Sequence, residues 1–196
     1  AQSRFLRNVV NRMRNQFFNT HGISLGSIRY YDMPSDYSII NGSEELHQMQ
    51  RQQSIKAPEG GLNVFLVSNI NLDGGYSTDA LGVAGGIPAP VGVNGTGGSG
   101  ITMIVQSSAT STGDIIAHEL GHLFGFYHVT EAQRYDGVLM HDVIADTVSC
   151  TKPPSEMWDT EACMYNIMYP YAITGMVTQS FSNTQGLIMR LNPRGR

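Results

Sequence analysis

Several features that define other protein classes are scarce in this chain of 196 residues. No apolar run approaches the roughly 20 residues of a membrane-spanning helix, so we expect no membrane span. Lysine is rare, and the net charge of −4 leaves no basic surplus for nucleic acid or anionic membranes. Only two cysteines occur, and their spacing is not that of a Cys-x-x-Cys metal knuckle. What is left is a chain whose length suits one domain with a buried core.

One stretch, residues 114–128, concentrates side chains with catalytic chemistry. In a helix, His118 and His122 lie one turn apart on the same face, so their imidazoles can bind one metal ion. Glu119 follows the first histidine and can reach a water on that metal. These residues match the His-Glu-x-x-His motif, which combines two zinc ligands with a general base.

His128 is the candidate third ligand. In an unbroken helix it would lie about 15 Å along the axis from His118, whereas zinc–nitrogen bonds are about 2.0–2.1 Å long. The chain must therefore turn, and Gly125 tolerates the positive φ that a turn needs. The spacing predicts a helix that ends near Phe124 and a bend at Gly125. Three protein ligands leave one zinc position open, as in catalytic sites. The alternative is a core helix whose histidines bind no metal.

This run, H-E-L-G-H-L-F-G-F-Y-H, resembles the zinc site of the metzincin metallopeptidases. The match covers every position that carries the pattern: His118, Glu119, His122, Gly125 and His128. Residues 166–171 resemble the metzincin Met-turn, in which Met168 would lie beneath the zinc histidines. The resemblance implies a zinc endopeptidase with one catalytic zinc ion, acting on extended proteins or peptides through a zinc-bound water. The rival interpretation is a catalytically silent zinc-binding module for adhesion or binding, against which the intact Glu119 argues.

The order of elements predicts an α+β fold. Helical periodicity over residues 3–20 predicts an amphipathic helix, and we expect a short polar helix over residues 44–53. Strand-like patterns occur at 23–31, 62–67 and 101–106, before the zinc helix. This order favours a mixed sheet with helices packed on it, and we expect 62–67 to be a central strand.

The resemblance implies a single catalytic domain over residues 1–196. Its upper subdomain, about residues 1–125, would hold a twisted mixed sheet and packed helices above the zinc cleft. Its lower subdomain, about residues 126–196, would be irregular and would end in a helix. We expect Thr112 or Asp114 to cap the zinc helix.

The C-terminal helix has its own signals. Ser182 followed by Gln185 is a capping-box pattern. We expect the apolar side chains of this helix to face the core: Leu187, Ile188 and Leu191.

By the same resemblance, the substrate lies extended along the edge strand of the sheet. We assign that edge to the strand just before the zinc helix: Ile101, Thr102, Met103, Ile104, Val105 and Gln106. In several metzincin groups a tyrosine two residues past the methionine approaches the zinc. Pro170 takes that position here, so Tyr171 is the candidate transition-state donor.

Two subfamilies are open alternatives. Tyr169 and Pro170 after the methionine are similar to matrixins. Residues 142–147, the two cysteines and the Phe-Ser-x-x-Gln start of the last helix are similar to pappalysins.

We expect a secreted or extracellular protein, with the periplasm or the cell surface as alternatives, and we expect a monomer. The chain begins at Ala1 without methionine or signal peptide, so we expect a processed mature or trimmed form. In an oxidising compartment we expect Cys150 and Cys163 to form a disulfide, with two buried free thiols as the alternative.

Further metal sites have weaker signals. Asp73 and Asp79, in the glycine-rich run 71–100, are candidate calcium ligands, with turn formation as the alternative. A second metal at His141 and nearby aspartates is a further alternative to solvated loop charges.

Overall fold

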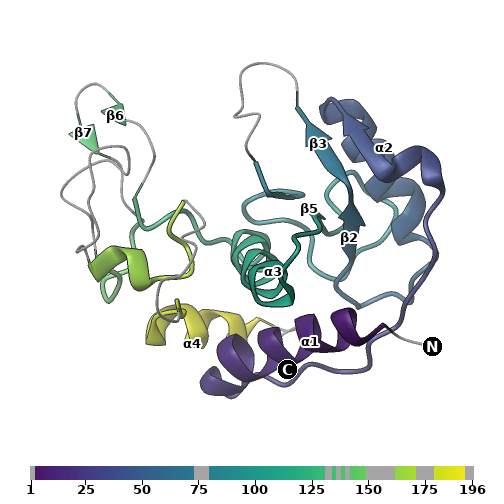
Figure 1. The fold of residues 1–196 in the computed structure, drawn as a ribbon. Coiled ribbons are helices and arrows are strands. Elements are labelled where there is room, and N and C mark those ends of the chain that lie inside the picture. Colours follow the sequence, from purple (N-terminus) through teal and green to yellow (C-terminus); the bar gives the residue numbers. More distant parts are fainter. Residues whose placement is uncertain are drawn as a thin grey trace.

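The computed structural model describes residues 3–72, 80–130, 134–135, 138–139, 142–148, 162–170 and 179–192. They form a mixed α+β structure of helices around small sheets (Figure 1). The α-helices are α1 Arg4–Arg12, α2 Ser43–Ser54, α3 Ala109–Leu123 and α4 Asn183–Leu191. Within the described ranges, no helix combines the length and apolar composition that a bilayer crossing requires.

The strands are short, and the largest sheet is mixed. They are β1 Ile39–Asn41, β2 Val64–Val67, β3 Asn69–Asn71, β4 Gly82–Ala84, β5 Ile101–Ile104, β6 Arg134–Tyr135 and β7 Val138–Leu139. The three-stranded sheet has the order β2-β5-β4, with β5 parallel to β2 and antiparallel to β4. Strands β1 and β3 form a parallel pair, and β6 and β7 form an antiparallel pair. A mixed sheet was expected, and this expectation is confirmed.

The predicted positions within the sheet are wrong. Strand β5 hydrogen-bonds to β2 on one side and to β4 on the other, so residues 101–106 are not an edge strand. Residues 62–67 were expected to be central, yet β2 is an edge of this sheet in the described part of the chain. Consecutive burial of Ile101, Thr102 and Met103 agrees with a strand that is covered on both faces. Val105 and Gln106 lie beyond the strand.

Helices cover the two faces of the sheet. Ile101 and Met103 belong to the main core with α1 and α3, whereas Phe65 and Val67 belong to a smaller core with α2. On the α2 side, buried Gln50 donates its Nε2 hydrogen to Thr102 Oγ1 at 3.2 Å. The zinc-motif helix α3 is therefore held between the sheet and α1 (Figure 1).

The predicted N-terminal helix is present, in three segments. Helix α1 continues as a π-helical segment, Met13–Phe18, and a 3₁₀ turn, Asn19–His21, and it stops at Gly22 with φ of 70°. Arg12 Nε donates to Asp114 Oδ1 at 2.7 Å and so joins α1 to α3. Because Asp114 makes this ion pair inside α3, it is not the helix cap.

Helix α3 begins earlier than predicted. Its N-cap is Ser108, whose hydroxyl accepts a hydrogen bond from the Ser111 amide. Thr112 lies inside the helix, where its hydroxyl accepts a hydrogen bond from the Gln106 amide at 3.2 Å. The prediction of Thr112 or Asp114 as cap is wrong because both side chains bond to other segments.

The predicted strand at residues 23–31 is also wrong, because residues 23–34 belong to no strand. Ile23 is buried, but Ile28 and Tyr30 are 39% and 47% exposed. The alternating apolar residues therefore do not form one buried face, which is what a half-buried strand requires.

Helix α4 has the predicted capping box, formed by Ser182 and Gln185. The face expected in the core is wrong, since Leu187, Ile188 and Leu191 are 42%, 39% and 58% exposed. The buried positions are Gln185, Gly186 and Met189. Gly186 has no side chain, and a Cβ there would overlap the His21 ring. Because α4 approaches His21 so closely at Gly186, the helix face that carries Gly186 lies against the core. Leu187, Ile188 and Leu191 therefore lie on the exposed side.

Candidate active site

The end of α3 is a tight reversal of the chain. The helix ends at Leu123 with Phe124 as C-cap, and Gly125 adopts φ of 101°. The Gly125 amide donates to the His122 carbonyl at 2.9 Å, and the Phe126 amide donates to the Gly121 carbonyl at 3.0 Å. These two bonds form a Schellman motif, which needs a left-handed residue at the glycine. The predicted helix end and bend are confirmed.

This reversal brings His118, His122 and His128 together. One ligand atom from each lies within 4.8 Å of the others. The Nε2 atoms of His122 and His128 are 3.1 Å apart. Tetrahedral zinc with bonds of about 2.05 Å places its ligands about 3.3 Å apart, so this spacing suits zinc. The histidine cluster in a metallopeptidase-like motif therefore indicates a zinc site.

Backbone carbonyls orient two of the imidazoles. His118 Nδ1 lies 2.6 Å from the Ile167 carbonyl oxygen, and His122 Nδ1 lies 2.7 Å from the Phe126 carbonyl oxygen. A carbonyl oxygen only accepts, so each Nδ1 carries the proton and each Nε2 keeps its lone pair. This is the tautomer that binds a metal through Nε2.

The electrostatics of His118 agree with such a role. Burial, followed by the charges of His122 and His128, lowers the pKa of His118 well below its ordinary value, and the bond to Ile167 opposes this shift. A ring that stays neutral at physiological pH is ready to bind a cation without first losing a proton.

Glu119 lies on the same helix and contacts strand β4. It is 6% exposed. Burial raises the pKa of Glu119 to about 8, and a hydrogen bond from the Ala84 backbone amide opposes the rise. A Cβ on Gly82 would lie 2.8 Å from Glu119 Oε1, so only glycine leaves room for the carboxylate there. Gly82 and Ala84 were not predicted as site residues, because the sequence marks them only by the glycine-rich composition of residues 71–100.

Met168 is fully buried beneath α3. A Cβ on Gly121 would overlap its Sδ and lie 3.2 Å from its Cε, so the thioether packs directly on the helix backbone between His118 and His122. The Met168 carbonyl accepts a hydrogen bond from the Val129 amide at 3.0 Å, next to His128. The methionine segment thus contacts the chain on both sides of the bend.

Substitution of Gly121 by alanine tests this packing. We expect the added methyl group to displace Met168 and to lower the free energy of unfolding by about 1–3 kcal/mol, the usual cost of overpacking. Urea titration of Gly121→Ala, Met168→Ala and the double variant measures it. Because the clash disappears with the thioether, the alanine at 121 should cost less in the Met168→Ala background. Strictly additive losses would contradict the contact.

Several predicted residues lie outside the described part of the chain: Tyr171, Cys150, Asp73, Asp79 and His141. Cys163 is described and is fully buried. Its pairing with Cys150 stays a prediction. Over the described residues, the histidine cluster is the group of side chains found to suit a metal, and calcium gains no support.

Comparison with known proteins agrees with this geometry. The family model Reprolysin_5, metallo-peptidase family M12, matches residues 1–182. No curated protein matches the chain. The family match selects neither matrixins nor pappalysins. A match over most of the chain, together with a histidine cluster suited to zinc, shows that the chain belongs to metallo-peptidase family M12.

Proposed function

We propose that the chain is a zinc-dependent endopeptidase of the metzincin type, in which His118, His122 and His128 hold one catalytic zinc ion. Three imidazoles, two from α3 and one from the chain after the bend, converge beside Glu119, a buried glutamate of α3, and this observation carries the proposal. Residues 1–196 then act as one catalytic domain, which is secreted and monomeric. Met168 serves as its Met-turn residue, and Tyr171 is a candidate transition-state donor.

When bound, zinc supplies Lewis-acid chemistry, which acidifies water and polarises a carbonyl group. Glu119 acts as the general base: it accepts a proton from the attacking water as the oxygen adds to the scissile carbonyl carbon. It then passes this proton to the leaving amine nitrogen as the carbon–nitrogen bond breaks. The carbonyls of Ile167 and Phe126 keep the rings of His118 and His122 in the orientation that binding requires.

Strand β4 replaces β5 as the strand along which we place an extended substrate. It is the edge of the three-stranded sheet on the side of α3, within the described residues. Leu81 and Gly85 bond to the neighbouring strand segment, so alternation turns the backbone groups of Gly82 and Ala84 outward. The outward Ala84 amide already reaches Glu119, which places this edge beside the proposed base.

Zinc analysis combined with a peptide digest tests the function. Purified protein is supplied with zinc and then dialysed. Its zinc content, measured by inductively coupled plasma mass spectrometry, should be about one zinc ion per chain. A peptide library should be cleaved, and a chelator should stop cleavage until zinc is restored. Absence of bound zinc would overturn the proposal. One zinc ion without cleavage of any peptide would favour the silent binding module instead.

A further inference from the structure

One peptide group orients the imidazole of His118. Its carbonyl belongs to Ile167 and lies 2.6 Å from His118 Nδ1, and its amide belongs to Met168. The peptide is at the centre of a turn, which the Tyr169 amide closes by donating to the Asn166 carbonyl at 3.1 Å. Turns of types I and II share such a closing bond but differ in the direction of their central peptide. The closing bond alone therefore does not direct the Ile167 carbonyl at His118.

The side chain of Asn166 makes the additional contact that holds this peptide. Its Oδ1 accepts a hydrogen bond from the Met168 amide at 2.8 Å. The Met168 amide and the Ile167 carbonyl are opposite ends of one peptide group, so fixing one end fixes the other. A peptide whose N–H is hydrogen-bonded is also polarised, and its carbonyl becomes a stronger acceptor. The bond to Asn166 therefore both orients the carbonyl that faces His118 and strengthens it.

Helix α4 holds Asn166 in turn. Asn166 Nδ2 donates to Gln185 Oε1 at 3.0 Å, and the same oxygen accepts from the Ser182 amide at 2.8 Å as part of the capping box. A backbone amide can only donate, so Gln185 presents its oxygen to Ser182. For the same reason Asn166 presents its oxygen to Met168, which leaves its nitrogen for Gln185. The direction of each bond is thereby fixed.

Both amide side chains are buried. Gln185 is fully buried and Asn166 is 9% exposed, so water has little access to the bond between them. Among the described residues, Gln185 Nε2 is buried without a hydrogen-bond partner. A buried donor that is left unsatisfied is costly and calls for an explanation. The orientation of Gln185 leaves its own nitrogen unsatisfied while its oxygen bonds to both Ser182 and Asn166.

We propose that Asn166 is a positioning residue for His118 and that Gln185 supports it from α4. This inference rests on the proposed function, in which His118 is a zinc ligand. Three hydrogen bonds in series connect α4 to the imidazole, through the Gln185 and Asn166 side chains and the central peptide of the turn. They keep the His118 proton on Nδ1 and leave Nε2 for the cation. Asn166 acts through the peptide, not by contact with the metal.

The zinc-free protein gives the first test. In Asn166→Leu the Met168 amide loses its acceptor, while the side chain keeps its branched shape. We expect the single Nδ1-protonated tautomer of His118 to give way to a mixture of both tautomers. The ¹⁵N chemical shifts of the ring nitrogens measure this at a pH where the imidazoles are neutral. Asn166→Asp keeps an acceptor for the Met168 amide and should keep the wild-type tautomer.

Zinc affinity gives the second test. Loss of an outer-shell partner costs about 10–100-fold in metal affinity, so we expect Asn166→Leu to bind zinc at least about tenfold more weakly. Competition with a chromophoric chelator measures the affinity. Asn166→Asp should bind zinc nearly as well as wild type. Gln185→Leu should weaken binding in the wild-type background but not further in the Asn166→Leu background, because its effect passes through Asn166.

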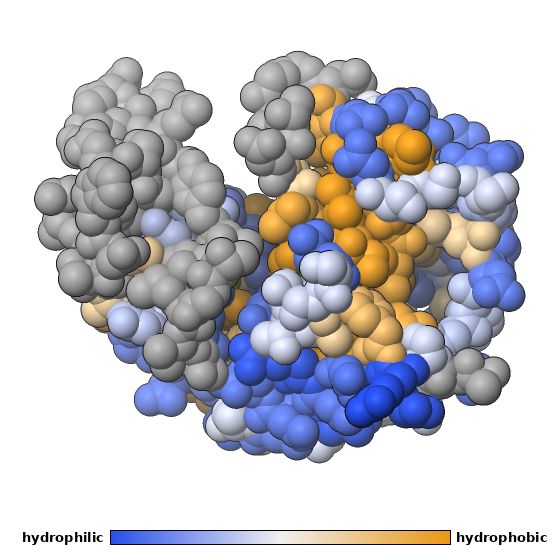
Figure 2. All heavy atoms as spheres, viewed as in Figure 1, coloured by the Kyte–Doolittle hydropathy of each residue, from blue (hydrophilic) through white to orange (hydrophobic). Residues whose placement is uncertain are grey.

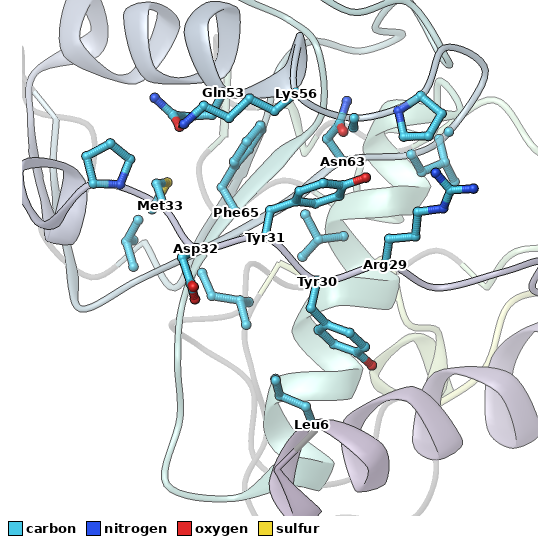
Figure 3. A pocket seen from close by; sticks show the side chains of 18 of the residues that line it. Leu6, Arg29, Tyr30, Tyr31, Asp32, Met33, Gln53, Lys56, Asn63 and Phe65 are labelled. Atoms are coloured by element: carbon cyan, nitrogen blue, oxygen red, sulfur yellow. The ribbon is translucent and has the colours of Figure 1, made fainter. Parts of the chain in front are cut away.

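Asn63→Leu is the matched control for a general loss of stability. Hydrophobic residues gather on the surface over β2 and β5 (Figure 2), and Asn63 lines a groove beside β2 (Figure 3). Its Nδ2 donates to Asn94 Oδ1 at 2.8 Å and to the Ser99 carbonyl at 2.9 Å. Strand β5 separates β2 from β4, which is the strand that contacts Glu119. Asn63→Leu should lower the urea midpoint but leave the His118 tautomer and the zinc affinity unchanged.

Three outcomes would overturn the inference. The first is a wild-type tautomer and zinc affinity in folded Asn166→Leu. The second is an equal loss of affinity in Asn63→Leu, which would make the effect one of general stability. The third is an equal loss in Asn166→Asp, which would show that the acceptor for Met168 is unimportant.

The two proposals can fail separately. A wild-type protein that binds no zinc would overturn the proposed function, whereas the tautomer measurement needs no zinc and still decides the role of Asn166. If circular dichroism shows that Asn166→Leu is unfolded, Asn166→Ala takes its place in both measurements, because it removes the same acceptor without adding volume.

Discussion

Replacement of Glu119 by glutamine is expected to lower kcat/KM for peptide cleavage by about 10²–10⁴-fold, the usual contribution of a general base, while about one zinc ion per chain is retained. Glutamine has the size of glutamate but cannot accept the proton of the attacking water. The three histidines are untouched, so the metal should stay. Cleavage of a fluorogenic peptide, measured beside elemental analysis of the same samples, checks both halves of the expectation.

Because Glu119 is buried, we expect the Glu119→Gln substitution to change the chemistry of the site with little effect on folding stability. Because burial raises the pKa of Glu119 to about 8, its carboxyl group is largely protonated at neutral pH in the absence of a cation. A neutral glutamine therefore resembles the state that already occupies the site, and we expect little loss of folding stability. Glu44→Gln makes the same chemical change at an exposed position of α2 and should leave cleavage unaffected. Activity near that of wild type in Glu119→Gln would remove this residue from the mechanism.

The bend and the histidine cluster could be predicted from sequence because both depend on local geometry. The rise of an α-helix and the length of a zinc–nitrogen bond together require a turn between His122 and His128. Gly125 is the residue that allows it, with φ of 101°. Helix length, C-cap and ligand convergence all follow from residues close together in the chain.

The position of β4 could not be predicted in this way. It has only three residues, and its pairing with β5 joins segments separated by about twenty positions. Nothing in the local pattern of Gly82 or Ala84 reveals that each touches Glu119. The same applies to the Ile167 carbonyl, which orients His118 from 49 residues away. Every residue type has a backbone carbonyl, and nearly every one has a backbone amide. Long-range contacts made by these groups therefore cannot be predicted from the composition or the periodicity of the sequence.

Helix α4 shows that the hydrophobic pattern of a short helix does not always predict which face is buried. Its leucines and isoleucine indicate one face as the core, but Gly186 allows the opposite face to approach His21. Asp146 also bonds to the N-terminus of this helix, with Ser182 Oγ and the Thr184 amide each 2.8 Å from its carboxylate oxygens. The orientation of a short helix is thus set by its contacts rather than by its hydrophobic residues alone.

Removal of the third imidazole is the other change with a large expected effect. In His128→Ala we expect zinc affinity to fall by more than about a hundredfold, since loss of an outer-shell partner alone costs about 10–100-fold. His118 and His122 would remain on α3 as a two-ligand site. Competition between metal-free protein and a chromophoric chelator measures the affinity, and circular dichroism verifies that α3 is intact. Tyr127→Ala, which removes a neighbouring side chain that is 55% exposed, is the matched control and should bind zinc normally.

Gly125→Ala separates the bend from the ligand that it delivers. Alanine in the left-handed region costs roughly 1–2 kcal/mol, so the reversal should be strained while all three imidazoles are kept. We therefore expect a zinc affinity between those of wild type and His128→Ala, because some of the binding energy is used to hold the strained turn. If His128→Ala binds zinc as tightly as wild type, the returning chain does not supply a ligand. If Gly125→Ala instead binds as weakly as His128→Ala, the position of the third imidazole depends entirely on this one glycine.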